Sequence, residues 1–150
     1  MLKFYCLESN LKIEEIITLV KEYKAIVLRG ELAYLRDFIG FCNKQARKDF
    51  LEKTNIAKQF ELQWILRIAC KKNIGQALDF TKPRNGRIAI VCEKAIPGKI
   101  MGKIGIPLEI ENTAKILEKL SEEFGMTKAA KEKYPLEELL IEKSLVEISQ

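Results

Sequence analysis

Histidine is absent from the 150 residues of this chain. Its absence excludes an imidazole general base, a Ser-His or Cys-His catalytic couple and any metal held by histidine. Long apolar runs are also missing, since none approaches the ~18 residues of a membrane span. Residues 1–5 are not followed by a signal-peptide core and cleavage site. We therefore expect a cytoplasmic protein that does not associate with membranes.

Paired cysteine motifs are missing as well. Four cysteines occur, but none forms a C-x-x-C pair, so neither a zinc knuckle nor a thioredoxin-like motif is expected. Each lies among apolar residues, which favours buried, inert thiols over reactive ones. The four positions are Cys6, Cys42, Cys70 and Cys92.

No known catalytic motif is present. The segment Gly98–Ile104 resembles a phosphate loop, but three residues rather than four separate its glycines, and Ile104 stands where a hydroxyl residue is needed. Adjacent acids such as Glu137 and Glu138 point in different directions on a helix, which indicates solvated faces. We expect no catalytic residue, cofactor, metal or small-molecule substrate. An enzyme that uses a cysteine or a carboxylate is the weakest hypothesis.

The composition is that of a globular protein, with 47% apolar and 31% charged residues, and its length favours one domain over residues 1–150. Short apolar runs predict strands at Leu2–Leu7, Ala25–Leu28 and Arg87–Cys92, the last being buried on both faces. A turn is expected at residues 81–86, which contain Pro83 and Asn85-Gly86.

Helical periodicity covers most of the remainder. Helices are predicted for residues 11–20 with Asn10 as cap, for 32–48, for Ile56–Cys70 opened by Thr54 or Asn55, from Asn73 onward, in a short stretch within 97–107, for Ala114–Phe124 capped by Thr113 and ended by Gly125, and from Pro135 to Lys143. Residues 144–148 look more like a strand than a continuing helix, and both alternatives stay open. The fold class is therefore α/β in the α+β sense, with a small mixed sheet of three to five strands packed with about six to eight helices.

Charge is unevenly distributed along the chain. The net charge is +2 over residues 1–50, +6 over 51–110 and −3 over 111–150, and +5 in total. A basic middle and an acidic end indicate an anionic partner at one place and a different contact at the other, although a solvated surface accounts for them equally well.

The helix at 56–70 carries polar residues at four-residue intervals, which predicts one exposed edge. These residues are Gln59, Gln63, Arg67 and Lys71. Downstream, a basic corner has a local charge of +5 and consists of Arg67, Lys71, Lys72, Lys82, Arg84 and Arg87 against Asp79. Asn73 begins a helix beside it. Helix N–H groups flanked by cations suit a phosphate or a nucleic-acid backbone. The alternative is that Arg67 and Lys71 only solubilise a buried helix.

The segment Ile56–Leu78 resembles the central motif of the small regulatory subunit of the KEOPS/EKC complex, the PRPK-binding protein family, in its archaeal form. That motif has a helix, a Ser-Gly-like pair, basic residues, Gln-Ile and an Ala-Ile or Ala-Leu pair. The matching positions are Leu66, Lys72, Ile74, Ala77 and Leu78. Ala69-Cys70 stands where Ser-Gly is usual, and Asn73 where Gln is usual. The strand Ile88–Glu93 and the segment Leu139–Ile148 extend the resemblance weakly over the chain.

The resemblance implies a non-catalytic adaptor that binds the PRPK-type kinase/ATPase of KEOPS and helps to recruit tRNA by its 3′ CCA end. KEOPS modifies the adenosine beside the anticodon to threonylcarbamoyl-adenosine. By this analogy the tRNA site would consist of Lys58, Arg67, Lys71, Lys72 and Asn73. The kinase surface would include Leu136, Leu139, Leu140 and Lys143. The alternative is a stand-alone protein–protein interaction module with an incidental basic patch.

Overall fold

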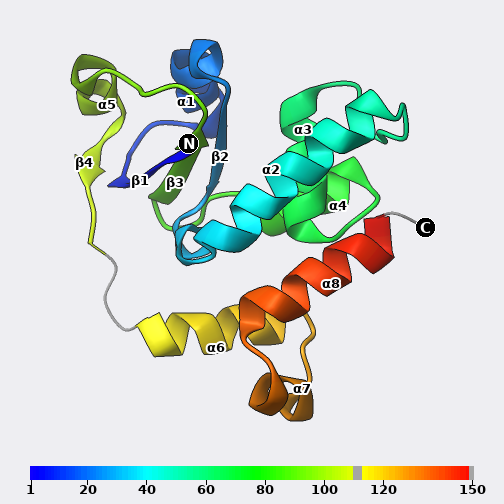
Figure 1. Cartoon of the computed structure of the whole chain (residues 1–150). Helices are drawn as coiled ribbons and strands as arrows, with labels where there is room; N and C mark the ends of the chain where they lie inside the picture. Colours follow the sequence, from blue (N-terminus) through cyan, green and yellow to red (C-terminus); the bar gives the residue numbers. More distant parts are fainter. Residues whose placement is uncertain (110–112, 149–150) are drawn as a thin grey trace. The chain divides into compact units, whose positions relative to one another are not determined.

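The computed structural model describes residues 1–109 and 113–148 of the chain (Figure 1). Within this part the chain forms two compact units. The first holds residues 1–33 and 81–109, and the second holds residues 34–80 and 113–148. Each unit thus combines two segments that are distant in the sequence. The predicted α+β class is confirmed, with four strands and eight α-helices among the described residues.

The first unit is built on a sheet with the strand order β2-β3-β1-β4. The strands are β1 (Lys3–Glu8), β2 (Ala25–Arg29), β3 (Arg87–Cys92) and β4 (Ile106–Pro107). The first three confirm the predicted strands, whereas the two-residue β4 was not predicted. The most apolar strand, β3, lies inside the sheet, where Ile90 is opposite both Tyr5 of β1 and Val27 of β2.

The expectation of a mixed sheet is wrong, because every neighbouring pair of described strands is antiparallel. The order strand, helix, strand in residues 3–29 is typical of two parallel neighbours. Here β1 and β2 do run in the same direction, since both are antiparallel to β3. However, β3 lies between them, so no parallel pair forms. The position of β3, which comes late in the sequence, therefore makes the sheet antiparallel.

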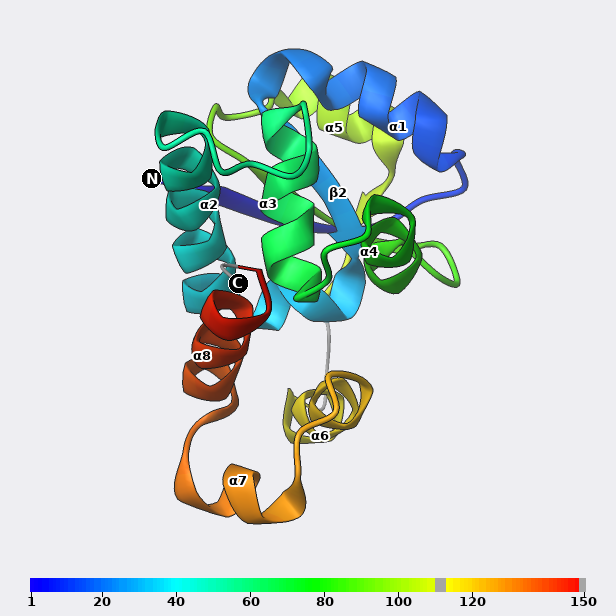
Figure 2. The ribbon, with the colours of Figure 1, turned by 90° about the vertical axis from the view of Figure 1, so that its right-hand side faces the viewer.

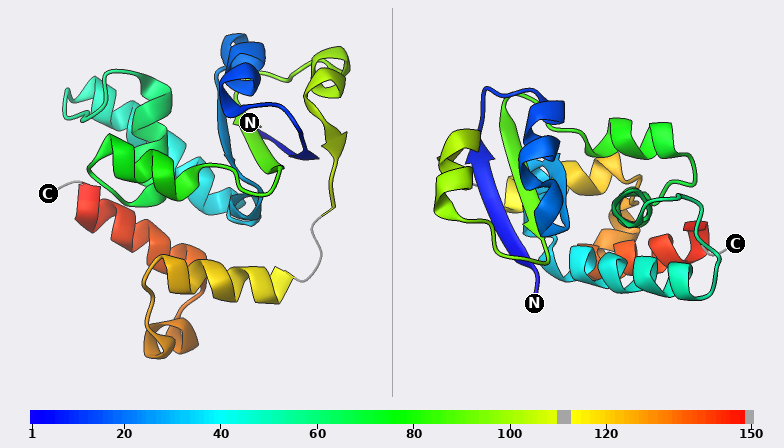
Figure 3. Two further views of the ribbon diagram at one scale, coloured as in Figure 1. Left: turned by 180° about the vertical axis from the view of Figure 1, so that it is seen from behind. Right: turned by 90° about the horizontal axis from the view of Figure 1, so that it is seen from above.

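Helices α1 (Ile13–Val20) and α5 (Gly98–Ile104) pack on one face of this sheet (Figure 3). Ile16 and Val20 of α1 and Ile104 of α5 share one core with Val27 and Ile90 from the strands. Alternation along the strands directs these side chains to the same face. Two 3₁₀ turns, Lys21–Tyr23 and Gly30–Tyr34, flank β2.

The cap predicted for α1 is wrong, since the helix begins at Ile13 after Lys12, which makes no side-chain cap. The side chain of Ser9 instead makes hydrogen bonds in the loop that precedes this helix. Its Oγ accepts from the Leu11 N–H at 3.1 Å and donates to the Ile104 carbonyl at 2.5 Å. The turn before β3 is confirmed by the positive φ angles of Asn85 (58°) and Gly86 (71°).

The second unit is helical (Figure 2). Its helices are α2 (Arg36–Leu51), α3 (Phe60–Ala69), α4 (Ile74–Thr81, the last residue lying in the first unit), α6 (Thr113–Glu123), α7 (Lys128–Lys133) and α8 (Leu136–Ile148). Helices α2, α3 and α8 pack against one another. Trp64 of α3 is fully buried and donates its indole N–H to the Ile39 carbonyl of α2 at 3.1 Å. This bond gives the buried indole the partner that it needs.

Helix α3 begins four residues later than predicted, and neither Thr54 nor Asn55 caps it. The Gln63 amide oxygen accepts from the N–H groups of Ile56 and Ala57, both at 2.9 Å. These N–H groups are therefore bonded to a side chain that reaches back from the helix. Residues 56–59 form an ordered loop as a result, with Gln59 at the N-cap position.

The preference for a strand at residues 144–148 is wrong, because α8 continues to Ile148. Ser144 lies inside the unit and bonds to α3, which holds this segment in the helix. Helix α7 was not predicted and is capped by the Thr127 hydroxyl, which accepts from Ala130 N–H at 3.1 Å. The predicted end of α6 at Gly125 is confirmed by its φ of 76°, whereas the predicted Thr113 cap lies outside what the structure describes.

Helix α2 starts at Arg36 without a cap from its own N-cap residue, Leu35. Glu137 of α8 supplies the missing acceptor, since its carboxylate receives the Phe38 N–H at 2.7 Å. Burial raises the pKa of Glu137, and the backbone N–H of Phe38 opposes that shift. A carboxylate at a helix N-terminus also interacts favourably with the helix dipole, so this contact ties α8 to α2.

The backbone at Gly105, between α5 and β4, lies very close to the backbone of Glu8 in β1. A Cβ on Gly105 would overlap the carbonyl oxygen of Glu8, whereas a Cβ on Gly102 within α5 would meet nothing within 4 Å. Gly105 has extended backbone, so lack of space rather than conformation requires glycine there.

We predict that Gly105→Ala lowers the free energy of unfolding by about 1–3 kcal/mol, because β4 must move away from β1. The matched control Gly102→Ala should raise it by about 0.5–1 kcal/mol, since alanine favours the helix at an unobstructed site. Urea denaturation of both variants measures the difference. Equal effects of the two substitutions would contradict the conclusion that lack of space requires glycine at position 105.

Candidate functional site

A buried ion pair joins α2 to α3. The Arg67 guanidinium bonds to Asp49 through Nη2 at 2.6 Å and Nε at 2.9 Å, and both residues are less than 5% exposed. The Gln63 amide donates to the same carboxylate at 2.8 Å. Two parallel bonds between planar groups match the geometry that arginine and carboxylates favour. Gln63 and Arg67 therefore do not form an exposed edge, and that prediction is wrong.

The same arginine joins α3 to α8 through Ser144. Arg67 Nη1 donates to the Ser144 carbonyl at 3.2 Å, and the Ser144 hydroxyl donates to the Arg67 carbonyl at 3.0 Å. Arg67 O is one of the last carbonyls of α3, and it also accepts from the Cys70 N–H at 3.3 Å. The reciprocal bonds fix the end of α3 against the middle of α8.

Helix α3 stops at Cys70, which has left-handed backbone (φ 56°). The Lys71 N–H then bonds back to the Leu66 carbonyl at 3.2 Å. Asn73 begins α4 as predicted, since its side-chain oxygen accepts from the Gln76 N–H at 2.9 Å. Lys71 and Lys72 therefore occupy a two-residue connection between the end of one helix and the cap of the next, and both are exposed.

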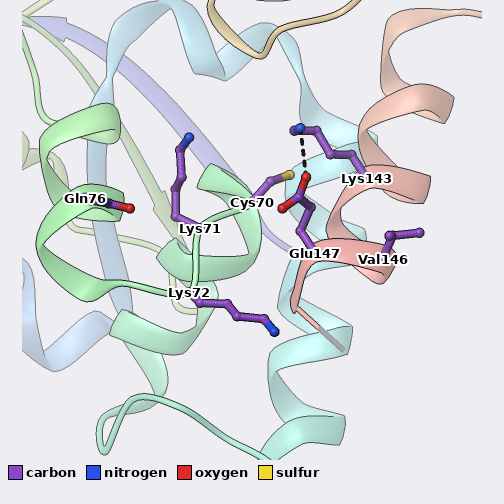
Figure 4. A pocket seen from close by; sticks show the side chains of 7 residues that line it. All are labelled: Cys70, Lys71, Lys72, Gln76, Lys143, Val146 and Glu147. Carbon is purple, nitrogen blue, oxygen red and sulfur yellow. Dashed lines mark hydrogen bonds and ion pairs between the residues drawn. The ribbon is translucent and has the colours of Figure 1, made fainter. Parts of the chain in front are cut away.

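A pocket of about 530 Å³ lies between this connection and α8 (Figure 4). Its lining consists of Cys70, Lys71, Lys72, Gln76, Lys143, Val146 and Glu147. Lys143 and Glu147 form an ion pair at 3.2 Å across one turn of α8. Among these lining residues three lysines face a single glutamate, so the pocket favours an anionic ligand.

The thiol in this pocket has a raised pKa because it is buried. Burial raises the pKa of Cys70 to about 12, while the Lys143 charge lowers it by a smaller amount and the Glu147 charge raises it. Burial also raises the pKa of Cys42, and that of Cys92 to about 11. The prediction of buried thiols is confirmed for these three, whereas Cys6 is only half-buried.

The structure brings together only part of the predicted tRNA site. Lys71, Lys72 and Asn73 lie on the α3–α4 connection, but Arg67 is buried in its ion pair. Lys58 is exposed in the loop before α3, so the ten residues of that helix, about 15 Å in length, separate it from Lys71. The other members of the basic corner, Lys82, Arg84 and Arg87, are exposed residues of the first unit.

The four residues of the predicted kinase surface do not all lie at the surface. Leu136 and Leu139 are half-buried, Leu140 is fully buried, and Lys143 lines the pocket. Leu140 is therefore a core residue of the second unit and not part of a surface. The exposed apolar side chains of α8 are instead Leu145, with an exposed fraction of 39%, and Val146, with 50%.

Sequence reasoning missed Gln76, Val146 and Glu147 as pocket residues, and it missed the Asp49–Arg67 pair. A signal for the pair was present. Asp49 follows Cys42 and Ala46 at helical spacing on the buried face of α2, while Arg67 lies in the most apolar helix. Two opposite charges on buried faces indicate an ion pair.

We predict that Arg67→Met lowers the free energy of unfolding by about 3–5 kcal/mol, because it leaves the Asp49 carboxylate buried without its partner. Lys48→Met is the matched control, since Lys48 is exposed and lies 4.0 Å from Glu52, and it should change stability by less than about 0.5 kcal/mol. The double variant Asp49→Leu, Arg67→Met should recover most of the loss. Thermal and urea unfolding measure all three, and similar costs for the two single variants would refute the role assigned to the pair.

The described residues contain no group of three His, Cys, Asp or Glu side chains that could hold a metal ion. No helix in residues 1–109 or 113–148 combines the length and apolarity needed to cross a bilayer. No protein-family model matches the chain, and no curated protein sequence matches it. The pocket must therefore be interpreted from its own chemistry.

Proposed function

We propose that this protein is a non-catalytic adaptor of the KEOPS type, which binds tRNA through the lysine pocket and also binds a PRPK-type kinase/ATPase. The observation that carries the proposal is the position of the pocket. Lys71, Lys72 and Gln76 come from the segment Ile56–Leu78, on which the resemblance to the KEOPS regulatory subunit rests, and Lys143 and Glu147 are added by α8.

The chemistry of the pocket supports RNA as the ligand. Flexible lysines neutralise phosphates without selecting a sequence, and this gives an affinity that falls with salt. The Gln76 amide can donate to and accept from the edge of an unpaired base, as in the recognition of single-stranded RNA. The first turn of α4 adds a partial positive charge beside Lys72. A single-stranded end such as CCA offers both phosphates and unpaired bases.

Apolar side chains of α8 support the kinase half of the proposal. Leu136 and Leu139 are half-buried, while Leu145 and Val146 are exposed. Interface cores are depleted in charge and enriched in apolar groups. With Leu140 in the core, Leu136, Leu139, Leu145 and the half-buried Ile141 are apolar groups that α8 offers to a protein partner, and Val146 lines the pocket as well.

We predict that Lys71→Glu, Lys72→Glu weakens tRNA binding by at least about tenfold at physiological salt, because two phosphate contacts become repulsive. Filter binding or fluorescence anisotropy over a salt series measures the affinity. The log of the affinity should also decrease less steeply with the log of the salt concentration. The steepness should drop by about 1.4, because each of the two lost single-strand phosphate contacts contributes ~0.7. Removal of the CCA end from wild-type substrate should lower the affinity similarly.

The matched control is Lys53→Glu, Lys58→Glu, which changes the net charge equally in the exposed loop before α3. It should change tRNA affinity less than about twofold, through long-range electrostatics alone. Equal losses for the two double variants would show that general charge, rather than the pocket, binds tRNA. If wild-type protein retains the kinase at high salt but binds no tRNA at low salt, the stand-alone protein–protein module is correct and the RNA role is not.

A further inference from the structure

Glu147 is the one acid among the lysines that line the pocket, and phosphate binding does not explain it. Its side chain is 49% exposed, and its Oε1 lies 3.2 Å from Lys143 Nζ. Figure 4 shows both groups directed to the same side of the pocket as Cys70, while Lys71 and Lys72 extend from the α3–α4 connection. An ionised carboxylate only accepts hydrogen bonds, and so does a phosphate. Glu147 therefore repels the group that the lysines attract.

The arrangement at Lys143 and Glu147 matches a different group. Lys143 only donates hydrogen bonds, and Glu147 only accepts them. A hydroxyl both donates and accepts, so a single hydroxyl can bond to both residues of the pair. An exocyclic base amine only donates, and a base carbonyl only accepts. Within a nucleotide chain the hydroxyl group that distinguishes ribose from deoxyribose is the 2′-OH, and it lies next to the phosphates.

A hydroxyl ligand also preserves the ion pair. An exposed pair at i,i+4 spacing contributes only about 0.3–0.5 kcal/mol to stability. A phosphate bound to Lys143 would lie beside the Glu147 carboxylate and be repelled by it, whereas a hydroxyl can bridge Nζ and the carboxylate. Carboxylates bind ribose hydroxyls in the same way in dinucleotide-binding folds.

We propose that Glu147, with Lys143, makes the pocket specific for ribose over deoxyribose by accepting a hydrogen bond from a ribose hydroxyl. Glu147 excludes deoxyribonucleotides because its charge repels their phosphates and meets no donor in return. This inference rests on the proposed function and assigns a specificity-determining residue to it. Val146, on the same turn of α8, offers an apolar contact to the sugar.

The test compares three single-stranded oligonucleotides of the same sequence, with ribose, 2′-O-methyl-ribose or deoxyribose throughout. The 2′-O-methyl sugar keeps the oxygen but has no hydrogen to donate to Glu147. Wild-type protein should bind the ribose form about tenfold more tightly than either of the others, as expected for a hydrogen bond to a charged group. Fluorescence anisotropy at constant salt measures the three affinities.

Glu147→Ala should bind all three oligonucleotides within about twofold of one another, since the acceptor and its repulsion are both removed. Glu147→Gln keeps an acceptor and should retain part of the preference. Glu142→Ala is the control, because Glu142 is exposed on α8 and does not line the pocket, and it should keep the wild-type preference.

A wild-type protein that binds the three oligonucleotides equally, or a Glu147→Ala variant that keeps the ribose preference, would overturn the inference while RNA binding stood. A wild-type protein that binds none of the three would overturn the proposed function, and this inference with it.

Discussion

The buried pair of Asp49 and Arg67 determines the arrangement on which the site depends. A charge without a partner inside a protein costs several kcal/mol, so each of these residues requires the other. Asp49 lies on α2 and Arg67 on α3, and Arg67 also exchanges two hydrogen bonds with Ser144 of α8. Three helices are therefore held by one guanidinium. The α3–α4 connection and the lysine of α8 face each other because Arg67 precedes the first and Ser144 adjoins the second.

The pocket separates two kinds of polar group. Lys71 and Lys72 contribute positive charge from the α3–α4 connection, whereas Lys143 and Glu147 present a donor beside an acceptor. Phosphates match the first pair and hydroxyls match the second. The local chemistry therefore describes a sugar–phosphate chain better than a free anion.

Much of the fold could be predicted from the sequence, because periodicity and capping are local. The three longer strands, the Asn73 cap and the end of α6 follow from short patterns. What could not be predicted depends on distant partners. The antiparallel sheet results from the insertion of β3 between β1 and β2, and the helical state of residues 144–148 depends on Ser144 bonding to α3. Arg67 looked exposed by spacing because its partner, Asp49, lies 18 residues earlier.

The proposed RNA site lies where the α3–α4 connection meets α8. Titration of ¹⁵N-labelled protein with a short single-stranded oligoribonucleotide, followed by backbone amide chemical shifts, locates the bound RNA. We expect the largest shifts at Lys71, Lys72, Gln76 and residues 143–147, with little change at residues 52–59. Shifts that concentrate at residues 52–59, or that leave residues 71–76 and 143–147 unchanged, would contradict the proposed site.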